Sequence, residues 1–269
     1  MKALICPLCS LPLVENITGV VCSNRHQFDK AKEGHFNLLP VHYKNSRDPG
    51  DSKQQLVARR AFLTAGYFSP LVSQLKTLID VNINNLVDIG CGEGYFTRFL
   101  GEHCYNAAVY GVDISKEGIR IAAKGRSAKE TYLVASSYAL PIADASIDVV
   151  LRIYAPSKDE ELFRILKPGG QLIIVTPGED HLIGLRERIY DTIKPHPKPK
   201  VVQGFTELAL HSVSFPLDVP HGDLTESLLR MTPFSWKLTE ELLENLVNTG
   251  IKDQAHFQIS VYERARESI

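Results

Sequence analysis

Four residues near the start of the 269-residue chain have the types and the spacing of a zinc site. Two residues separate Cys6 from Cys9, twelve residues follow, and three residues then separate Cys22 from His26. Zinc prefers thiolate and imidazole ligands in a tetrahedron, and two close pairs joined by a longer segment are typical of zinc ribbons. With all four positions filled, no place remains for a water molecule. The sequence therefore predicts one structural zinc ion per chain.

The segment between the two ligand pairs has the pattern of a hairpin. Residues 16–19, Asn-Ile-Thr-Gly, form a turn sequence between two apolar stretches, so the chain is expected to fold back and bring the pairs together. The alternative is a reduced Cys-x-x-Cys with an unrelated cysteine and histidine nearby. The odd total of five cysteines, without a secretory signal, indicates a reducing and hence cytoplasmic location.

A second chemical motif follows the apolar run Leu86–Ile89. Glycines occupy positions 90, 92 and 94, where they allow tight backbone turns and the close approach of a ligand. A dinucleotide fingerprint requires glycine at position 95, but the residue there is Tyr95. An acidic residue in the strand, here Asp88, followed by Gly-x-Gly-x-Gly resembles instead the S-adenosylmethionine (SAM) loop of class I methyltransferases.

Three later features agree with this resemblance. Asp113 ends the next apolar run, nineteen residues after Gly94, where an acid can hold both ribose hydroxyls of a nucleoside. Segments 140–148 and 166–170 resemble those before the fourth and fifth strands of the family. The alignment places Ser136 where many relatives carry the acid that binds the adenine amino group, and a hydroxyl accepts that bond less strongly. SAM is thus the implied cofactor, and the residues expected to bind it are Tyr67, Asp88, Gly90, Gly92, Gly94, Tyr95, Phe96, Asp113, Ser136, Ser137 and His181.

Short apolar runs alternate with helical stretches from residue 84 onward, which predicts a parallel sheet covered on both faces, with ligands at the carboxyl ends of its strands. The expected strands are Leu86–Ile89, Ala108–Val112, Tyr132–Ala135, Ile147–Leu151, Leu172–Val175, Leu210–Leu217 and Phe257–Tyr262. The expected helices are Tyr95–Cys104, Lys116–Lys124, Lys158–Leu166 and a last one near Thr239–Asn248. Before the sheet, helices are predicted from Asp51 or Ser52 to about Ala65 and over Ser69–Ile79.

The chain is accordingly interpreted as α/β. We expect a zinc ribbon over residues 1–36, a helical connector over 37–84 and a class I SAM methyltransferase domain over 85–269. The large domain is expected to be Rossmann-like, with a mostly parallel seven-stranded sheet, and the ribbon to be a small N-terminal β domain. The polar cluster 45–52 is the best candidate for a boundary.

The ribbon and the methyltransferase motifs together narrow the resemblance. The two ligand pairs, the run 51–63, Gly66-Tyr67-Phe68, and Thr176-Pro177 before His181-Leu182 are similar to the RlmA family, especially its Gram-negative branch. These proteins are bacterial 23S ribosomal RNA guanine-N1 methyltransferases. The resemblance implies a ribbon that helps to recognise RNA, a target guanine in the loop of hairpin 35, and a homodimer.

Methylation of guanine N1 sets a chemical requirement, because this nitrogen carries a proton at neutral pH and is a poor nucleophile until the proton leaves. The segment Arg152–Pro156 follows the fourth strand, where class I enzymes acting on bases place their target. Tyr154 is a candidate to stack on a flipped guanine, and the alternative is a packed aromatic. His181 is a candidate for the base, for a contact to the SAM carboxylate or for a structural role. No residue is identified as the general base.

The charge distribution bears on RNA binding. The net charge of −1 excludes a uniformly basic surface, but residues 1–60 hold nine Lys and Arg against five Asp and Glu. Arg25, Lys30, Lys32, Arg59 and Arg60 are therefore candidate phosphate contacts, and the Lys194–Lys200 loop is the alternative RNA face. No apolar run reaches the length of a membrane helix. Rival functions are a small-molecule methyltransferase and an inactive module that binds RNA or protein.

Overall fold

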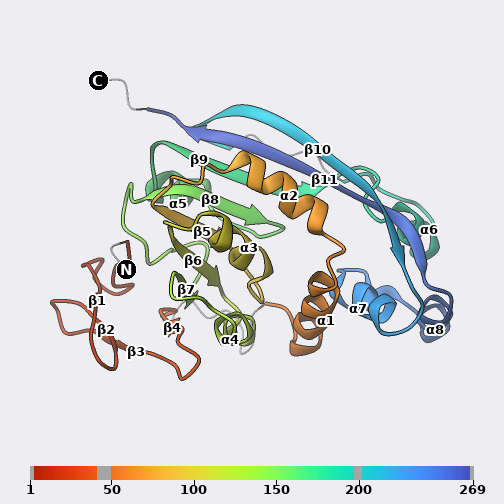
Figure 1. Cartoon of the computed structure of the whole chain (residues 1–269), viewed down its shortest axis with the longest axis horizontal. Helices are drawn as coiled ribbons and strands as arrows, with labels where there is room; N and C mark the ends of the chain where they lie inside the picture. The colour runs from red at the N-terminus through yellow and green to blue at the C-terminus, as the bar shows by residue number, and fades with distance from the viewer. Residues whose placement is uncertain (1–2, 41–49, 197–201, 267–269) are drawn as a thin grey trace.

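The computed structural model describes residues 3–40, 50–196 and 202–266. An eight-stranded sheet in the order β10-β11-β9-β8-β5-β6-β7-β4 forms its centre (Figure 1). Strands β4 to β9 run parallel to one another, whereas β11 pairs antiparallel with both β9 and the edge strand β10. The strands are β4 Phe36–Asn37, β5 Asn85–Ile89, β6 Ala108–Asp113, β7 Glu130–Val134, β8 Ile147–Ile153, β9 Leu166–Pro177, β10 Phe205–Val219 and β11 Ile251–Arg264.

This architecture confirms the expected class I methyltransferase fold, and β4 adds an eighth strand to the seven that were predicted. The strands read as continuous apolar runs because both faces of a parallel sheet are buried. The helices are α1 Lys53–Thr64, α2 Ser69–Leu78, α3 Tyr95–His103, α4 Lys116–Lys124, α5 Asp159–Ile165, α6 Ile183–Ile189, α7 Asp223–Met231 and α8 Glu240–Thr249. Helix α4 has the predicted bounds, and Ser52 caps α1 in a capping box with Gln55. Helices α6 and α7 were not predicted.

The N-terminal ribbon is a three-stranded sheet of β1 Val14–Glu15, β2 Gly19–Val21 and β3 Gln27–Asp29. The predicted hairpin is confirmed by the antiparallel pairing of β1 with β2. The Asn16 side chain closes the turn by accepting hydrogen bonds from the backbone N–H groups of Thr18 (3.0 Å) and Gly19 (2.8 Å).

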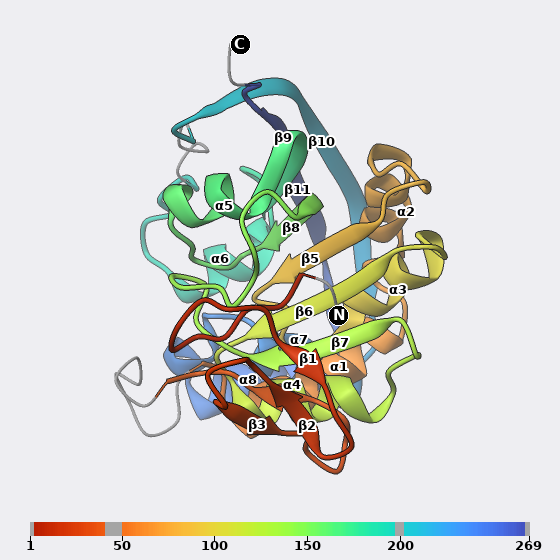
Figure 2. The same cartoon turned by 90° about the vertical axis from the view of Figure 1, so that its left-hand side faces the viewer.

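The ribbon lies against the face of the large sheet that also carries α5 (Figure 2). The connection from β7 to β8 contains no helix, so it leaves part of that face for the ribbon to cover. Ile5 N–H donates to the carbonyl of Pro141 (3.1 Å), and Ala143 N–H donates to the carbonyl of Ala3 (2.8 Å). Apolar residues of both parts form one buried cluster, which includes Leu4, Leu13, Val20, Phe36, Tyr110, Val112 and Ile142.

This shared core bears on the predicted division into three parts. Strand β4 pairs with β7, so the chain that leaves the ribbon joins the edge of the large sheet. The boundaries at residues 36 and 84 stay predictions, and most of the polar cluster 45–52 lies outside the described residues. None of the described helices is long and apolar enough to cross a membrane.

The opposite face of the sheet is covered by α2 and α3, and by α7 and α8 where β10 and β11 extend beyond the other strands (Figure 1). At the amino ends of the strands, the Asp148 carboxylate accepts hydrogen bonds from the backbone N–H of Asn85 (2.8 Å) and from Lys167 Nζ (2.5 Å). Asp148 therefore fastens the sheet, far along the strands from the glycine loop.

Gly94 is a position at which the fold has no room for a side chain. Its φ is +83°, and a Cβ there would lie 2.8 Å from both the Ala122 Cβ and the Tyr132 hydroxyl. Gly66 has a similar φ of +87°, but a Cβ there would meet nothing within 4 Å. We expect Gly94→Ala to lower the free energy of unfolding by about 2–4 kcal/mol, and Gly66→Ala by about 1–2 kcal/mol, because only the first adds a clash to the backbone strain. Urea unfolding of both variants measures this difference, and equal losses would contradict it.

Candidate functional site

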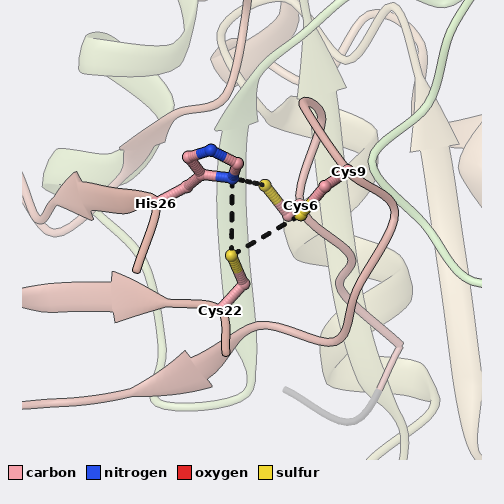
Figure 3. A group of neighbouring side chains, drawn as sticks. All are labelled: Cys6, Cys9, Cys22 and His26. Atoms are coloured by element: carbon pink, nitrogen blue, oxygen red, sulfur yellow. Dashed lines mark hydrogen bonds between the residues drawn. The ribbon is translucent and has the colours of Figure 1, made fainter. Parts of the chain in front are cut away.

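The four predicted zinc ligands lie together at one end of the ribbon (Figure 3). All four donor atoms are within 4.8 Å of one another. The Cys6 Sγ and the Cys22 Sγ lie 3.4 Å and 3.6 Å from the His26 Nδ1, and the Cys9 Sγ lies 3.7 Å from the Cys22 Sγ. A zinc tetrahedron with ordinary bond lengths has edges of about 3.5–3.8 Å. The three cysteines and the histidine therefore fit this metal in number, chemistry and spacing.

Two tight turns hold the ligands. In the first, Ser10 N–H donates to the Cys6 carbonyl (2.8 Å), and Ser10 has a φ of +58°. In the second, Arg25 N–H donates to the Cys22 carbonyl (2.8 Å), and Arg25 has a φ of +63°. Left-handed conformations cost energy in residues other than glycine, so each turn needs an external constraint. A metal bound by both turns supplies that constraint.

The second site begins at the loop between β5 and α3. The N–H groups of Gly90 (2.8 Å) and Cys91 (3.1 Å) both donate to the carbonyl of Val112 on the neighbouring strand β6. Gly90 has a φ of +71°, and a Cβ there would lie 2.3 Å from the Ala155 Cβ. A Cβ at Gly92 would meet only the Arg59 guanidinium, at 3.4 Å. The loop is thus held against β6 by the hydrogen bonds of Gly90 and Cys91. At Gly92 it stays open, and a ligand can approach the backbone there.

Asp113 joins the two loops that follow β5 and β6. One carboxylate oxygen accepts a hydrogen bond from Gly92 N–H (2.8 Å), and the other accepts one from Ser115 N–H (2.7 Å). Each oxygen keeps a second lone pair, which is what a pair of ribose hydroxyls requires. Burial raises the pKa of Asp113, although the two N–H donors oppose this effect.

Asp88 lies deeper, inside β5. Its side chain accepts a hydrogen bond of 2.6 Å from the hydroxyl of Thr97 on α3. Only 2% of the residue is exposed, and burial raises the pKa of its carboxyl to about 7. A cationic ligand group beside it would favour the ionised form.

A continuous cavity of about 800 Å³ extends from these loops. Most of the residues predicted to bind SAM line it, namely Asp88, Gly90, Gly92, Phe96, Asp113, Ser136, Ser137 and His181. The other three lie behind its wall. Gly94 precedes α3, Tyr95 packs edge-on against Phe96 and Phe99, and the ring of Tyr67 stacks on that of Phe62 at 4.7 Å. Ser136 is buried, and its hydroxyl accepts a hydrogen bond from Tyr138 N–H (3.2 Å).

Helix α1 contributes a wall of the cavity that the sequence analysis missed. Arg59 forms an ion pair with Asp51, and both line the cavity beside Gly92. Arg60 donates to the carbonyl of Ile121 at the end of α4 (3.3 Å). These two arginines, predicted to contact phosphates, thus serve the cavity and the packing of α1. The Ser52 cap signalled where α1 begins but not which side of it faces the cavity.

The far end of the cavity is aromatic. Tyr154, Phe68, Phe257 and His181 line it, and the ring centroid of His181 lies 6.2 Å from that of Tyr154 and 4.8 Å from that of Phe257. Tyr154 has a φ of +53° and is half exposed (50%), so the strained turn after β8 presents its ring to the cavity. The surrounding walls raise the pKa of its hydroxyl above the ordinary value of a tyrosine. We call this end of the cavity the aromatic slot, and its aromatic lining suits a flat, aromatic ligand.

His181 is held in one orientation. The backbone N–H of His256 donates to its Nδ1 (3.2 Å), so the proton of the neutral ring lies on Nε2. Burial lowers the pKa of His181 to about 4, and only 8% of the residue is exposed. A neutral imidazole with this pKa is a weak base but a good N–H donor.

The basic segment after His181 is partly structural. Arg186 is buried and donates to the carbonyls of Glu179 (3.1 Å) and Lys194 (2.5 Å), so it clasps the two ends of the segment around His181. Arg186 is therefore not available to RNA. Lys198 and Lys200 lie outside the described residues.

Loss of a zinc ligand is the first test of this site. We expect Cys9→Ser to release the metal and to lower the melting temperature of the whole chain, because the ribbon shares its core with the large sheet. SAM affinity should fall less than it does when Asp113 is changed, since the glycine loop is fastened within the sheet. Elemental analysis and thermal unfolding measure the effect, with Cys104→Ser as a control at a buried cysteine away from the ribbon. A full zinc content in Cys9→Ser would contradict the ligand assignment.

Comparison with known proteins identifies both the zinc ribbon and the methyltransferase domain. The family model for the N-terminal zinc ribbon of RlmA matches residues 4–47, and a methyltransferase domain model matches residues 87–174. The fold resembles a chain from the Haloferax volcanii complex of the Trm112 methyltransferase activator with a methyltransferase. That chain shares 19% identity and a TM-score of 0.50, over 82% of this chain and 100% of its own. This protein therefore combines a zinc ribbon with the SAM-dependent methyltransferase fold.

Relatives of known name match over most of the length. The 23S rRNA (guanine(748)-N(1))-methyltransferase of Streptomyces fradiae is 29% identical, over 88% of this chain and 86% of its own. A Bacillus subtilis protein that carries the name "Putative 23S rRNA (guanine-N(1)-)-methyltransferase" is 31% identical, over 88% of both chains. The chain therefore belongs to the RlmA family of 23S rRNA guanine-N1 methyltransferases.

Proposed function

We propose that this protein transfers a methyl group from SAM to N1 of a guanine in the hairpin 35 loop of 23S ribosomal RNA. The observation that carries the proposal is the continuous cavity that joins Asp113 and the glycine loop to the aromatic slot at Tyr154 and His181. One end has the groups that suit a nucleoside, and the other has the shape that suits a base. Transfer between two ligands requires this proximity.

Residues of the cavity beside the glycine loop bind the separate parts of SAM in this proposal. The Asp113 carboxylate accepts the two ribose hydroxyls, Ser136 and Ser137 face the adenine, and Gly92 allows the ligand to approach the backbone. The carboxyl of Asp88, once ionised, attracts a cationic group of the ligand. SAM supplies an electrophilic methyl group, and the side chains of the protein bind and orient the two ligands.

The aromatic slot binds the guanine that accepts the methyl group. Tyr154 stacks on the flipped guanine, which has to leave its own stack before the methyl group can reach it. When N1 loses its proton to solvent water, negative charge spreads onto O6 of the base. The neutral Nε2–H of His181 is suited to stabilise that charge as a hydrogen-bond donor, in the way of an oxyanion hole. We therefore assign His181 to positioning and charge stabilisation rather than to proton abstraction.

The ribbon is assigned to RNA recognition, as in the family. Arg25 and Lys32 are exposed on it, whereas Lys30 forms an ion pair with Glu15 at 2.8 Å. We propose Arg25 and Lys32 as phosphate contacts. A ribosomal RNA substrate also favours a cytoplasmic location, and a homodimer remains the family's expectation for the assembly.

Primer extension on cellular RNA tests the proposal. A methyl group on N1 blocks the pairing edge of guanine, so reverse transcriptase should stop beside the modified base in the hairpin 35 loop. The stop should disappear in a strain that lacks the protein and return with the wild-type gene, but not with one that encodes Asp113→Ala. A stop that persists in the deletion strain would overturn the proposed activity, and a lost stop elsewhere in the RNA would overturn the site.

The ribose assignment makes a quantitative prediction. A hydrogen bond to a carboxylate contributes about 1.5–3 kcal/mol, so Asp113→Ala should weaken SAM binding at least about tenfold. RNA affinity should change little, because Asp113 lies inside the cavity. Calorimetry with SAM measures the effect, and Asp148→Ala serves as a control acid at the other end of the strands. Unchanged SAM affinity in Asp113→Ala would contradict the assignment.

The RNA assignment predicts a change in salt dependence. Each phosphate contact contributes about one to the slope of log K against log salt, so Arg25→Ala with Lys32→Ala should lower the slope by about two. Titration of hairpin RNA at several salt concentrations measures it. Lys76→Ala on α2, away from the ribbon (Figure 1), is the basic control. An unchanged slope in the folded double variant would place the RNA face elsewhere.

A further inference from the structure

Trp236 stands out on the surface beside the cavity. It is the single tryptophan of the chain, it is 76% exposed, and it lines the mouth of the cavity. A large aromatic side chain usually buries most of its surface, so an indole left this open indicates a partner that covers it.

The local structure presents the indole from a fixed turn. Trp236 lies in the short 3-10 helix η2 Ser235–Lys237, which is closed by a hydrogen bond of 2.9 Å from Lys237 N–H to the Phe234 carbonyl. Ser235 N–H donates to the carbonyl of Thr232, a buried residue at the end of α7. The turn is therefore fastened to α7, whose Leu228 and Leu229 belong to the main core.

A cation accompanies the indole. The Lys237 Nζ lies 5.1 Å from the Trp236 ring centroid and 4.2 Å from that of Tyr190. Tyr190 in turn meets Phe234 edge-on, with centroids 6.0 Å apart. A flat aromatic face beside an ammonium group matches a nucleotide, which offers a base to stack and a phosphate to neutralise.

We propose that Trp236 stacks on a base of the substrate RNA next to the target guanine, while Lys237 contacts the adjoining phosphate. This inference rests on the proposed function. A guanine that enters the aromatic slot is turned out of its own stack, so the neighbouring nucleotides stay at the mouth and lose a stacking partner there. Trp236 lies at that mouth, and its indole takes the place of the base against which the neighbouring nucleotide was stacked. It is a positioning residue, since it lies outside the slot in which methyl transfer occurs.

The emission of the single tryptophan provides a direct test. Full-length wild-type protein is titrated with hairpin 35 RNA, while a fluorescent label on the RNA reports binding separately. The indole emission should fall and become protected from iodide, with the same midpoint as RNA binding. RNA binding that leaves both the emission and the iodide quenching unchanged would overturn the proposal.

Variants separate stacking from a structural role. Trp236→Ala should raise KM for RNA by roughly tenfold, with kcat at saturating RNA and SAM affinity nearly unchanged. Trp236→Phe keeps an aromatic face and should recover most of the loss. Tyr105→Ala is the matched control, because Tyr105 is also an exposed aromatic (55%) beside a lysine, but in the loop between α3 and β6, at the amino end of β6.

The outcomes distinguish this inference from the proposed function. If wild-type protein methylates no guanine in 23S RNA, the proposed function fails. If it methylates RNA and Trp236→Ala keeps the wild-type KM, the stacking role alone fails. A Trp236→Ala protein that keeps its RNA affinity but changes its oligomeric state in light scattering would show that a second copy of the chain covers the indole, and this also overturns the proposal.

Discussion

The site depends on one buried carboxylate that ties two loops together. Asp113 accepts hydrogen bonds from Gly92 and Ser115, which follow neighbouring parallel strands. These contacts fix the glycine loop beside the cavity, and they leave each carboxylate oxygen with a further lone pair for a ligand. In the proposed function the same carboxylate also accepts the ribose hydroxyls of SAM, which would couple the fold to the chemistry at this residue.

The aromatic slot is held in place by strained backbone turns and by hydrogen bonds between segments that are distant in the sequence. Tyr154 and Leu182 both have left-handed backbone conformations, at the turns that place Tyr154 and His181 in the cavity wall. Arg186 holds the segment around His181 by its two carbonyl contacts, and His256 on β11 fixes the tautomer of the ring. These contacts fix the side chains of the cavity wall in advance, so the entry of a ligand would need little reorganisation.

Local pattern was enough to predict much of this protein. The spacing of Cys6 to His26 predicted the cluster, and the Ser52 cap and the periodicity around α4 predicted helix bounds, because these signals lie within a few residues of one another. Contacts between distant segments were not predictable in this way. The pairing of Leu4 with Ile142, the turn of Arg59 into the cavity and the position of Trp236 at its mouth all depend on tertiary packing. The ion pair of Arg59 with Asp51 and the contact of Arg60 with α4 were likewise not predicted, and the role of these two arginines as phosphate contacts stays a prediction.

The measurement that tests the account most directly is nucleoside analysis after methyl transfer by the purified protein. Ribosomal RNA from a strain that lacks the protein is incubated with labelled SAM, digested and resolved by mass spectrometry. The account predicts label in 1-methylguanosine alone, about one per 23S RNA, because the proposed function places one flipped base in the aromatic slot with its N1 and O6 edge toward His181. Label at another position of guanine, in another base or in a small molecule would contradict it.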